Sequence, residues 1–267
     1  MEHQDKLKRL LVVCNGVALA GTIVVNALAN ALPLNGMNTG AISDSIPNLF
    51  VPAGFTFAVW GVIYVLLLVL VVYQITTVKR AVPTEEPILD LGPWFLISCV
   101  ANATWIFLWH WLLLIPSLMV MLVLLVSLII MHSRCRNSSA SVGYRIGIML
   151  PISVYLGWIT IATVANVTAV LVAAEWGRFG LSEVFWTVAV LVVAIIINML
   201  AVIVKGDIWF ALVGIWALYG IYAKRKQPQF EPTPQILYIT LLGMAVIAMV
   251  ILIHLVVKGR KVARGEL

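Results

Sequence analysis

The sequence is poor in charged residues. They make up 10% of the 267 residues, and 63% of the chain is hydrophobic. An average soluble domain has about 25% charged and about 45–50% apolar residues. The few Asp, Glu, Lys and Arg residues lie between or outside long apolar runs. A soluble fold cannot bury this much apolar surface, so we predict an integral membrane protein with several spans.

The absence of charge inside the apolar runs excludes several kinds of function. Charged residues within a membrane normally mark proton relays, ion paths and voltage sensors, so their absence argues against a proton-coupled pump. No lysine lies in the middle of an apolar run, which excludes a retinal pigment held as a Schiff base. His254 lies in the last run, and we expect it to pack rather than to bind haem or a metal.

Cysteine and catalytic motifs are also scarce. Cys14, Cys99 and Cys135 are isolated, which predicts neither a disulfide framework nor a metal site. They are expected to pack as small apolar residues. Neither a glycine-rich phosphate loop nor a zinc-binding spacing is present. We therefore predict no catalytic residues and no metal, and interpret the lone serines of the apolar runs as helix contacts: Ser98, Ser117, Ser127 and Ser153.

Eight apolar segments are long enough, or nearly long enough, to cross a bilayer, which takes about 20 residues. The charged residues 1–9 precede an apolar run that is too long for a signal peptide, so we expect a retained first helix. We predict an all-α polytopic bundle with a five-helix unit in residues 1–174 and about three further spans in residues 175–267. The segments are Leu10–Ala31, Gly54–Thr76, Gly92–Trp109, Leu112–Met131, Ile146–Ala173, Val184–Val204, Ile208–Tyr222 and Ile236–Val257.

The basic residues predict an orientation. With the amino terminus inside, the outer side holds only Arg178 and the cluster Lys224–Lys226, and the other Lys and Arg residues lie inside. This bias predicts a multi-pass protein of the cell membrane with both termini in the cytoplasm. The net charge of +6 therefore reflects topology, and we expect no nucleic-acid partner. The inner residues are Lys6, Lys8, Arg9, Lys79, Arg80, Arg134, Arg136, Arg145, Lys205, Lys258, Arg260, Lys261 and Arg264.

The cluster Lys224–Lys226 is the one exception to this bias. If the short seventh segment does not cross the membrane, the cluster returns to the inner side. The first outer loop, Pro33 to Val51, is rich in Asn, Gly and Ser, and is either a lid over the bundle or a solvated connector. Asn26 and Asn30 lie one turn apart in the first span and are expected to bond a neighbouring helix.

Aromatic and amide side chains recur at helical spacing in three of the predicted spans. Spacings of three and four residues place such side chains on one helical face. Asn in hydrocarbon costs free energy unless it is hydrogen-bonded, so we expect these faces to turn inward. The second span offers Phe57, Trp60 and Tyr64, the third offers Asn102, Trp105 and Trp109, and the fifth offers Pro151, Tyr155, Trp158, Ala162 and Asn166.

Two interpretations of these rings stay open. Rings with an N–H or O–H at the edge can stack on a flat apolar ligand and bond its polar rim. They can equally pack helix against helix, and Trp60, Trp105 and Trp158 fit both readings. Other tryptophans near span ends fit an aromatic belt at the membrane interface: Trp94, Trp109, Trp111, Trp176, Trp186 and Trp209.

Three blocks of this sequence resemble the TspO/MBR family of tryptophan-rich sensory proteins, which includes the mitochondrial translocator protein. The block Pro52–Tyr64 is similar to the family's Pro-Pro-Gly-Trp…Phe…Trp…Tyr block. Asn102–Phe107 resembles its Asn…Trp…Phe block, and the stripe from Pro151 to Asn166 resembles its Pro…Tyr…Trp…Ala…Asn block. The blocks keep the family's order, and the resemblance covers about residues 10–174. The last three spans lie beyond it.

The resemblance implies a five-helix pocket for a flat hydrophobic ligand, such as a porphyrin, haem or a sterol, with no cofactor required. It also implies a receptor or sensor in the lipid bilayer and a homodimer as in other members. Ala53 and Phe55 replace the family's second Pro and its Trp, which argues against the porphyrin breakdown attributed to some members. The alternative is a transporter of a small neutral or amphipathic solute. The expected ligand-binding residues are Phe55, Phe57, Trp60, Tyr64, Asn102, Trp105, Tyr155, Trp158 and Asn166.

Overall fold

A computed structural model describes residues 2–32, 34–78, 86–135 and 140–264 of the chain. These residues form helices, helical turns and connecting loops, with no strand among them, so the predicted all-α class is confirmed. The basic residues Lys79, Arg80 and Arg136, and Pro33 at the start of the first outer loop, lie outside the described part.

The chain forms two compact units. Unit 1 comprises Met1–Ser45 and Ala58–Val170, and unit 2 comprises Ile46–Phe57 and Leu171–Leu267. The short segment Ile46–Phe57 thus groups with the carboxyl-terminal helices, although it lies between two parts of unit 1 in the sequence. The predicted boundary near residue 174 stays a prediction.

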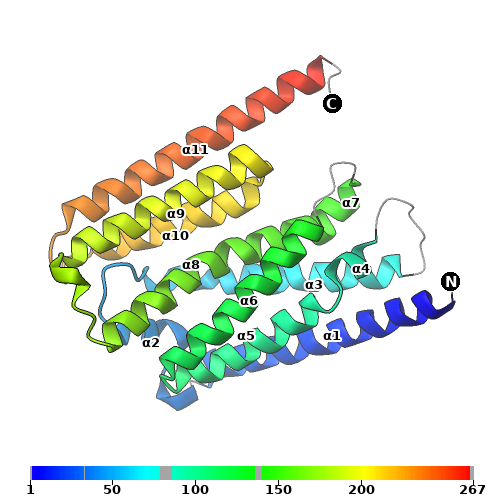
Figure 1. Ribbon diagram of the computed structural model, residues 1–267, viewed down its shortest axis with the longest axis horizontal. Helices are drawn as coiled ribbons and strands as arrows, with labels where there is room; N and C mark the ends of the chain where they lie inside the picture. Colours follow the sequence, from blue (N-terminus) through cyan, green and yellow to red (C-terminus); the bar gives the residue numbers. More distant parts are fainter. Residues whose placement is uncertain (1, 33, 79–85, 136–139, 265–267) are drawn as a thin grey trace. The chain divides into compact units, whose positions relative to one another are not determined.

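Unit 1 is a bundle of long helices that lie side by side (Figure 1). Helix α1 packs on α3 and α5, and α5 packs on α6. The short α2 and α4 cover the ends of these helices, on α5 and on α1 and α6 respectively. The elements are α1 (Glu2–Ala31), η1 (Leu34–Gly36), α2 (Thr39–Ser45), α3 (Val59–Thr77), α4 (Pro87–Leu91), α5 (Trp94–His110), α6 (Leu114–Arg134), α7 (Val142–Tyr144), η3 (Arg145–Met149) and α8 (Leu150–Ala173).

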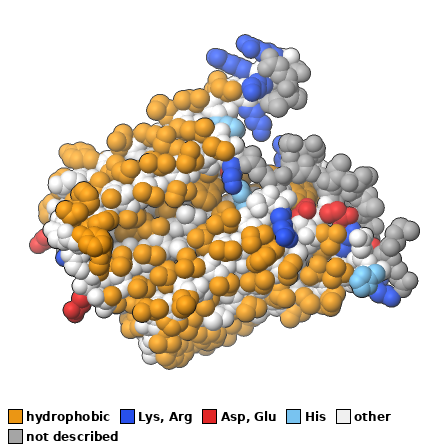
Figure 2. Space-filling model, viewed as in Figure 1, with side chains coloured by type: hydrophobic (Ala, Val, Ile, Leu, Met, Phe, Trp, Pro, Cys, Tyr) orange, Lys and Arg blue, Asp and Glu red, His pale blue; other side chains and the backbone are white. Residues whose placement is uncertain are grey.

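Helix α1 shows why these segments form a bundle. Its buried positions recur at three and four residues, which makes a single inward stripe; Leu19 and Asn26 are among them. The other faces expose large apolar side chains such as Val13, Val17 and Val24. Apolar side chains also cover much of the visible surface, and Lys and Arg gather at helix ends (Figure 2). A surface of this kind suits a hydrocarbon environment.

Unit 2 contains three antiparallel helices, α9 (Glu183–Lys205), α10 (Ile208–Arg225) and α11 (Pro234–Ala263), each in contact with the other two. The turn from α9 to α10 is encoded locally. Gly206 ends α9 in the left-handed region at φ 61°, where glycine carries no Cβ penalty. Asp207 then caps α10, because its Oδ1 accepts from the N–H of Phe210 at 3.1 Å.

Glycines allow the helices of unit 2 to pack closely. A Cβ built on Gly214 would overlap the Asn198 amide, and one built on Gly243 would lie 2.5 Å from Ile195 Cδ1. At the end of α10, Arg225 lies over the ring of Phe230 at 4.5 Å, and Lys224 lies 5.8 Å from the same ring. These cation–π contacts stabilise two residues of the basic cluster Lys224–Lys226.

All eight apolar segments expected from the sequence are helical. Within the described residues, six helical stretches are long and apolar enough to cross a membrane. Helix α5 is apolar but shorter, and α10, which ends on Lys224 and Arg225, is not among the six. By length and composition the chain is therefore a multi-pass membrane protein.

Candidate functional site

The rings predicted on the second, third and fifth spans converge in unit 1. Trp60 of α3 is the hub, and its ring is half-buried. Its centroid lies 6.4 Å from Trp105 of α5, and 6.0 and 6.3 Å from Tyr155 and Trp158 of α8. Tyr64 stacks on Trp60 one turn further along α3, at 5.7 Å. These distances are typical of directly packed aromatic pairs, so three helices contribute to one continuous group of rings.

Amide side chains form hydrogen bonds with this group of rings and with one another. Asn102 on α5 donates from Nδ2 to Tyr155 Oη at 2.8 Å, and its Oδ1 accepts from Asn26 Nδ2 at 2.7 Å. Trp105 donates from Nε1 to Asn166 Oδ1 at 2.9 Å. The aromatic cluster is defined here as Trp60, Tyr64, Asn102, Trp105, Tyr155, Trp158 and Asn166.

The inward amides are therefore paired, as hydrocarbon burial requires. Asn166 also donates from Nδ2 to Ser117 Oγ at 3.0 Å, so Ser117 of α6 is a helix contact, as expected. Asn26 bonds the neighbouring α5 as expected. Asn30 instead donates to the Asn26 carbonyl of its own helix, and its Oδ1 accepts from the N–H of Thr39 at 3.4 Å.

The hydroxyl group of Tyr64 is a polar group of the cluster with which a ligand could form a hydrogen bond. The hydroxyl oxygen of Tyr64 is buried and has no hydrogen-bond partner within the described structure. A buried hydroxyl that bonds nothing costs about 1–3 kcal/mol. It lies at the edge of a ring already stacked on Trp60, so a polar group of a bound molecule would satisfy it.

Phe55 and Phe57 belong to unit 2, whereas the seven members of the aromatic cluster lie in unit 1. The ring of Phe55 packs on α10, 5.6 Å from Trp216 and 5.8 Å from Tyr219, and is 44% exposed. Phe57 is half-buried. The motif that looks continuous in the sequence thus divides between the two units within the turn η2 (Gly54–Ala58).

Trp109 extends the cluster toward the first outer loop. Its ring stacks on Trp105 at 5.6 Å and is only 5% exposed. Its Nε1 donates to the Thr39 carbonyl of α2 at 3.3 Å. The sequence analysis placed Trp109 both on the inward face of Asn102 and Trp105 and among the tryptophans near span ends, and its buried ring agrees with the inward position. The ring lies inward because α2 covers this end of α5.

His110, which the sequence analysis missed, holds the same loop. It is completely buried, with Nδ1 at 3.0 Å from the Leu34 carbonyl and Nε2 at 3.1 Å from Thr39 Oγ1. Because the carbonyl can only accept, Nδ1 carries the proton and the Thr39 hydroxyl donates to Nε2. Asn35 also donates, from Nδ2 to the His110 carbonyl at 3.0 Å. The signal in the sequence was a lone histidine ending an apolar helix.

The described residues contain no group of three or more His, Cys, Asp or Glu side chains placed to hold a metal. The cysteines are free, and Cys99 and Cys135 are buried. Burial raises the pKa of the Cys135 thiol to about 12, so this thiol is neutral at physiological pH. The chemistry of the aromatic cluster is stacking and uncharged hydrogen bonding.

The comparison with known protein families gives one match. The model of the TSPO-like protein family matches residues 12–253. The match reaches beyond the five-helix region of the three motifs and includes most of α11. No curated protein and no solved structure gives a significant match. Because the family match covers most of the sequence, the chain belongs to the TSPO-like protein family, which supports a membrane protein of the sensor or receptor type.

Proposed function

We propose that the protein is a membrane receptor that binds a flat hydrophobic ligand, a tetrapyrrole or a sterol-like molecule, at the aromatic cluster of unit 1. The observation that carries this proposal is the convergence of Trp105, Tyr155 and Trp158 on Trp60, with centroids 6.0–6.4 Å away. Family membership supports the same class of function.

The contacts suggest how a ligand binds. Trp60 is half-buried, whereas Trp105, Tyr155 and Trp158 are each at most 5% exposed. Trp60 is therefore less enclosed than these three rings. When the Trp60 ring turns aside, a flat ligand stacks on the rings that Trp60 contacted. The aromatic contacts of Trp60 are thus replaced by contacts with the ligand. The hydroxyl of Tyr64 then bonds a carboxylate or hydroxyl at the rim of the ligand.

Binding is tested by titrating the purified protein with protoporphyrin IX and following tryptophan fluorescence. We expect saturable quenching that is strongly reduced in the triple variant W60F/W105F/W158F. The matched control W111F/W186F/W209F removes three indoles outside the cluster, of which Trp111 and Trp209 are exposed, and should keep the wild-type affinity. Equal affinity of the two triple variants, or no saturation in the wild type, would reject the proposal.

Transport of a small neutral or amphipathic solute is the second candidate, and a row of uncharged polar side chains along α1 favours it. Asn15 Nδ2 donates to Gln74 Oε1 at 2.9 Å, and both side chains are completely buried. Asn15 Oδ1 and Gln74 Nε2 have no partner among the described atoms. Asn26 lies eleven residues further, about 16 Å along a helix. Uptake of labelled protoporphyrin into proteoliposomes would support transport, and saturable binding without uptake would reject it.

We further propose that the protein resides in the cell membrane with both termini in the cytoplasm. The bias of Lys and Arg toward one set of loops carries this proposal. Cysteine-reactive labelling of a single cysteine placed at Ser141 or at Phe179 tests it. A membrane-impermeant reagent should label the Phe179→Cys variant in intact cells and leave the Ser141→Cys variant unlabelled, and the opposite pattern would overturn it.

A further inference from the structure

Unit 2 holds the segment Ile46–Phe57 through main-chain contacts. The N–H of Ala53 donates to the carbonyl of Gly220 at 3.0 Å, and the indole N–H of Trp216 donates to the carbonyl of Thr56 at 3.0 Å. Both partners lie on α10. A backbone group bonded in this way has its position set by the helix that bonds it.

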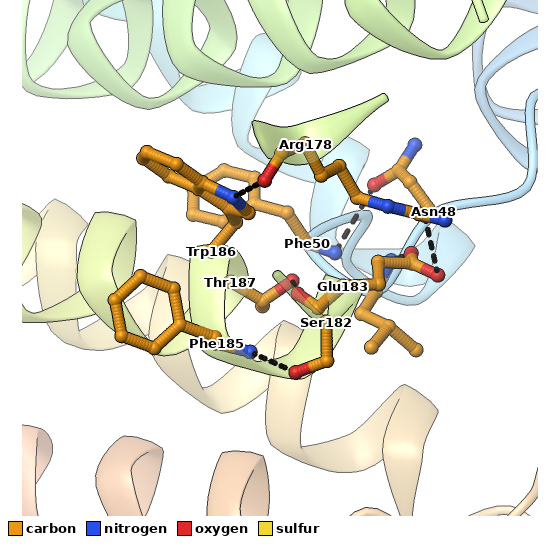
Figure 3. Close-up of polar contacts among 9 residues, drawn as sticks. Asn48, Phe50, Arg178, Ser182, Glu183, Phe185, Trp186 and Thr187 are labelled. Carbon is orange, nitrogen blue, oxygen red and sulfur yellow. Dashed lines mark hydrogen bonds and ion pairs between the residues drawn. The ribbon is translucent and has the colours of Figure 1, made fainter. Parts of the chain in front are cut away.

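The other end of the segment is bonded to α9. Leu49 donates from its N–H to Glu183 Oε1 at 2.9 Å, in the first turn of that helix. The same carboxylate faces Arg178 (Figure 3), whose guanidinium lies 3.9 Å from Glu183 Oε2. Asn48 makes the local turn, because its Oδ1 accepts from the N–H groups of Phe50 and Val51. The segment is therefore bonded at both of its ends.

Gly220 permits the closest of these contacts. A Cβ built at this position would overlap Thr56 Oγ1 and would lie 2.8 Å from Thr56 Cγ2 and 3.0 Å from Pro52 Cβ. Thr56 is completely buried there. A side chain on Gly220 therefore forces the buried Thr56, and with it the turn η2, or the backbone of α10 to shift.

The held segment continues directly into α3. The turn η2 ends at Ala58 and α3 begins at Val59, with helical backbone at the junction. Trp60, the hub of the aromatic cluster, is four residues beyond Thr56, about one helical turn. A displacement of Thr56 is thus transmitted along a continuous helical backbone to Trp60.

From these contacts we infer that α9 and α10 act as a clamp on the segment Ile46–Phe57, and that Gly220 and Trp216 are positioning residues for Trp60 in ligand binding. The inference rests on the proposed function, and it assigns a role to helices beyond the three sequence motifs. Unit 2 supplies no ring to the aromatic cluster in this account. It sets the backbone position at which the first turn of α3 begins, and so the position from which the Trp60 side chain projects.

The test compares two glycines of the same helix. Gly214→Ala creates a similar overlap on α10, but with Asn198 of α9, so it disturbs unit 2 without touching the segment. We expect G220A to weaken protoporphyrin IX binding about tenfold and G214A to leave the affinity unchanged. Both variants should lower the melting temperature by a comparable amount. The double variant T56A/G220A removes the overlapping methyl and hydroxyl and should restore the affinity. Equal affinities of G220A and G214A would overturn the inference.

A measurement without ligand separates this inference from the proposed function. The contribution of Trp60 to the near-ultraviolet circular dichroism spectrum is obtained by subtraction. The spectrum of each protein's W60F variant is subtracted from the spectrum of that protein. We expect this contribution to change in the G220A background and to be unaltered in the G214A background. An unaltered contribution in both backgrounds overturns the clamp, whereas a wild type that binds no protoporphyrin overturns only the receptor.

Discussion

Buried polar side chains have different partners in the two units. In unit 1 several bond from helix to helix, namely Asn26 to Asn102, Asn102 to Tyr155 and Trp105 to Asn166. Others there, Ser98, Ser127 and Thr163, bond carbonyls of their own helix. In the three helices of unit 2, Asn198 and Thr240 bond to carbonyls of their own helix. There Gly214 and Gly243 let the helices approach closely.

The difference indicates that the two units have different structural roles. Directional bonds between helices hold rings in defined orientations, as the proposed binding site requires. Close contact through glycines favours dense packing, which suits a rigid support. Unit 1 is thus organised around an aromatic cluster, and unit 2 around close contact of its helices. The following predictions test this contrast, from the largest expected effect to the smallest.

Gly243→Val should have the largest effect on stability. The added side chain meets Ile195 and the 3.1 Å neighbour Leu218, and overpacking of this kind costs about 1–3 kcal/mol. We expect a clear fall in the melting temperature in detergent. Gly259→Val is the control, because nothing lies within 4 Å of a Cβ built there. Equal melting temperatures for the two variants would mean that close packing does not stabilise unit 2.

Asn102→Leu should come next, with a loss of about 2 kcal/mol, since two membrane hydrogen bonds of about 0.6–2 kcal/mol each disappear. Both Asn26 Nδ2 and Tyr155 Oη lose the partner they have in the wild type. A double-mutant cycle with Asn26→Leu, read by thermal unfolding, isolates the bond between the two amides. Strict additivity of the two substitutions would show that this bond contributes nothing.

Trp105→Phe should cost about 1 kcal/mol. The substitution keeps an aromatic ring against Trp60 and Trp109 but removes the Nε1 bond to Asn166 Oδ1. Thermal unfolding measures the loss. Trp111→Phe, at a half-exposed position, is the reference and should be close to neutral. Equal stabilities of the two variants would show that the bond from Trp105 to Asn166 does not stabilise unit 1.

Asp90→Asn should have the smallest effect, visible as a change in pH dependence. Burial raises the pKa of Asp90, with Glu86 adding to the shift and the bond from Tyr144 and the charge of Arg134 opposing it. A folded-state pKa above the unfolded value gives stability that is complete below the unfolded pKa, about 3.9, and is lost as the pH rises through the folded pKa.

Asn at this position keeps an acceptor for Tyr144 Oη, which now donates to Asp90 Oδ2 at 2.8 Å, and it does not titrate. The stability of the variant should therefore stay constant across that pH window. The wild type should lose less than about 1 kcal/mol there, because solvent screens the charge of Asp90. Melting temperatures measured from pH 4 to pH 8 provide the check. A wild-type stability that rises with pH through this window, and by the same amount in the variant, contradicts the assignment to Asp90.

Much of unit 1 could be predicted because its information is local. Apolar runs predicted eight helices, and spacings of three and four predicted the faces carrying Trp60, Trp105 and Trp158. An unpaired amide is costly in hydrocarbon, so an inward position for Asn102 and Asn166 followed as well. The place of Phe55 on Trp216 and Tyr219 could not be predicted, since the partners are about 160 residues away in the sequence and no spacing rule joins them.

By itself, the sequence determined the membrane class, the helical segments and the ring-bearing faces, because hydrophobicity and helical periodicity act over neighbouring residues. Only the tertiary structure decided that Trp109 and His110 lie beneath α2 and that the motif from Pro52 to Tyr64 divides between two units. Those outcomes depend on which distant backbone carbonyl or glycine a segment meets. Gly220 shows the reason, because its missing side chain matters only where Thr56 packs against it.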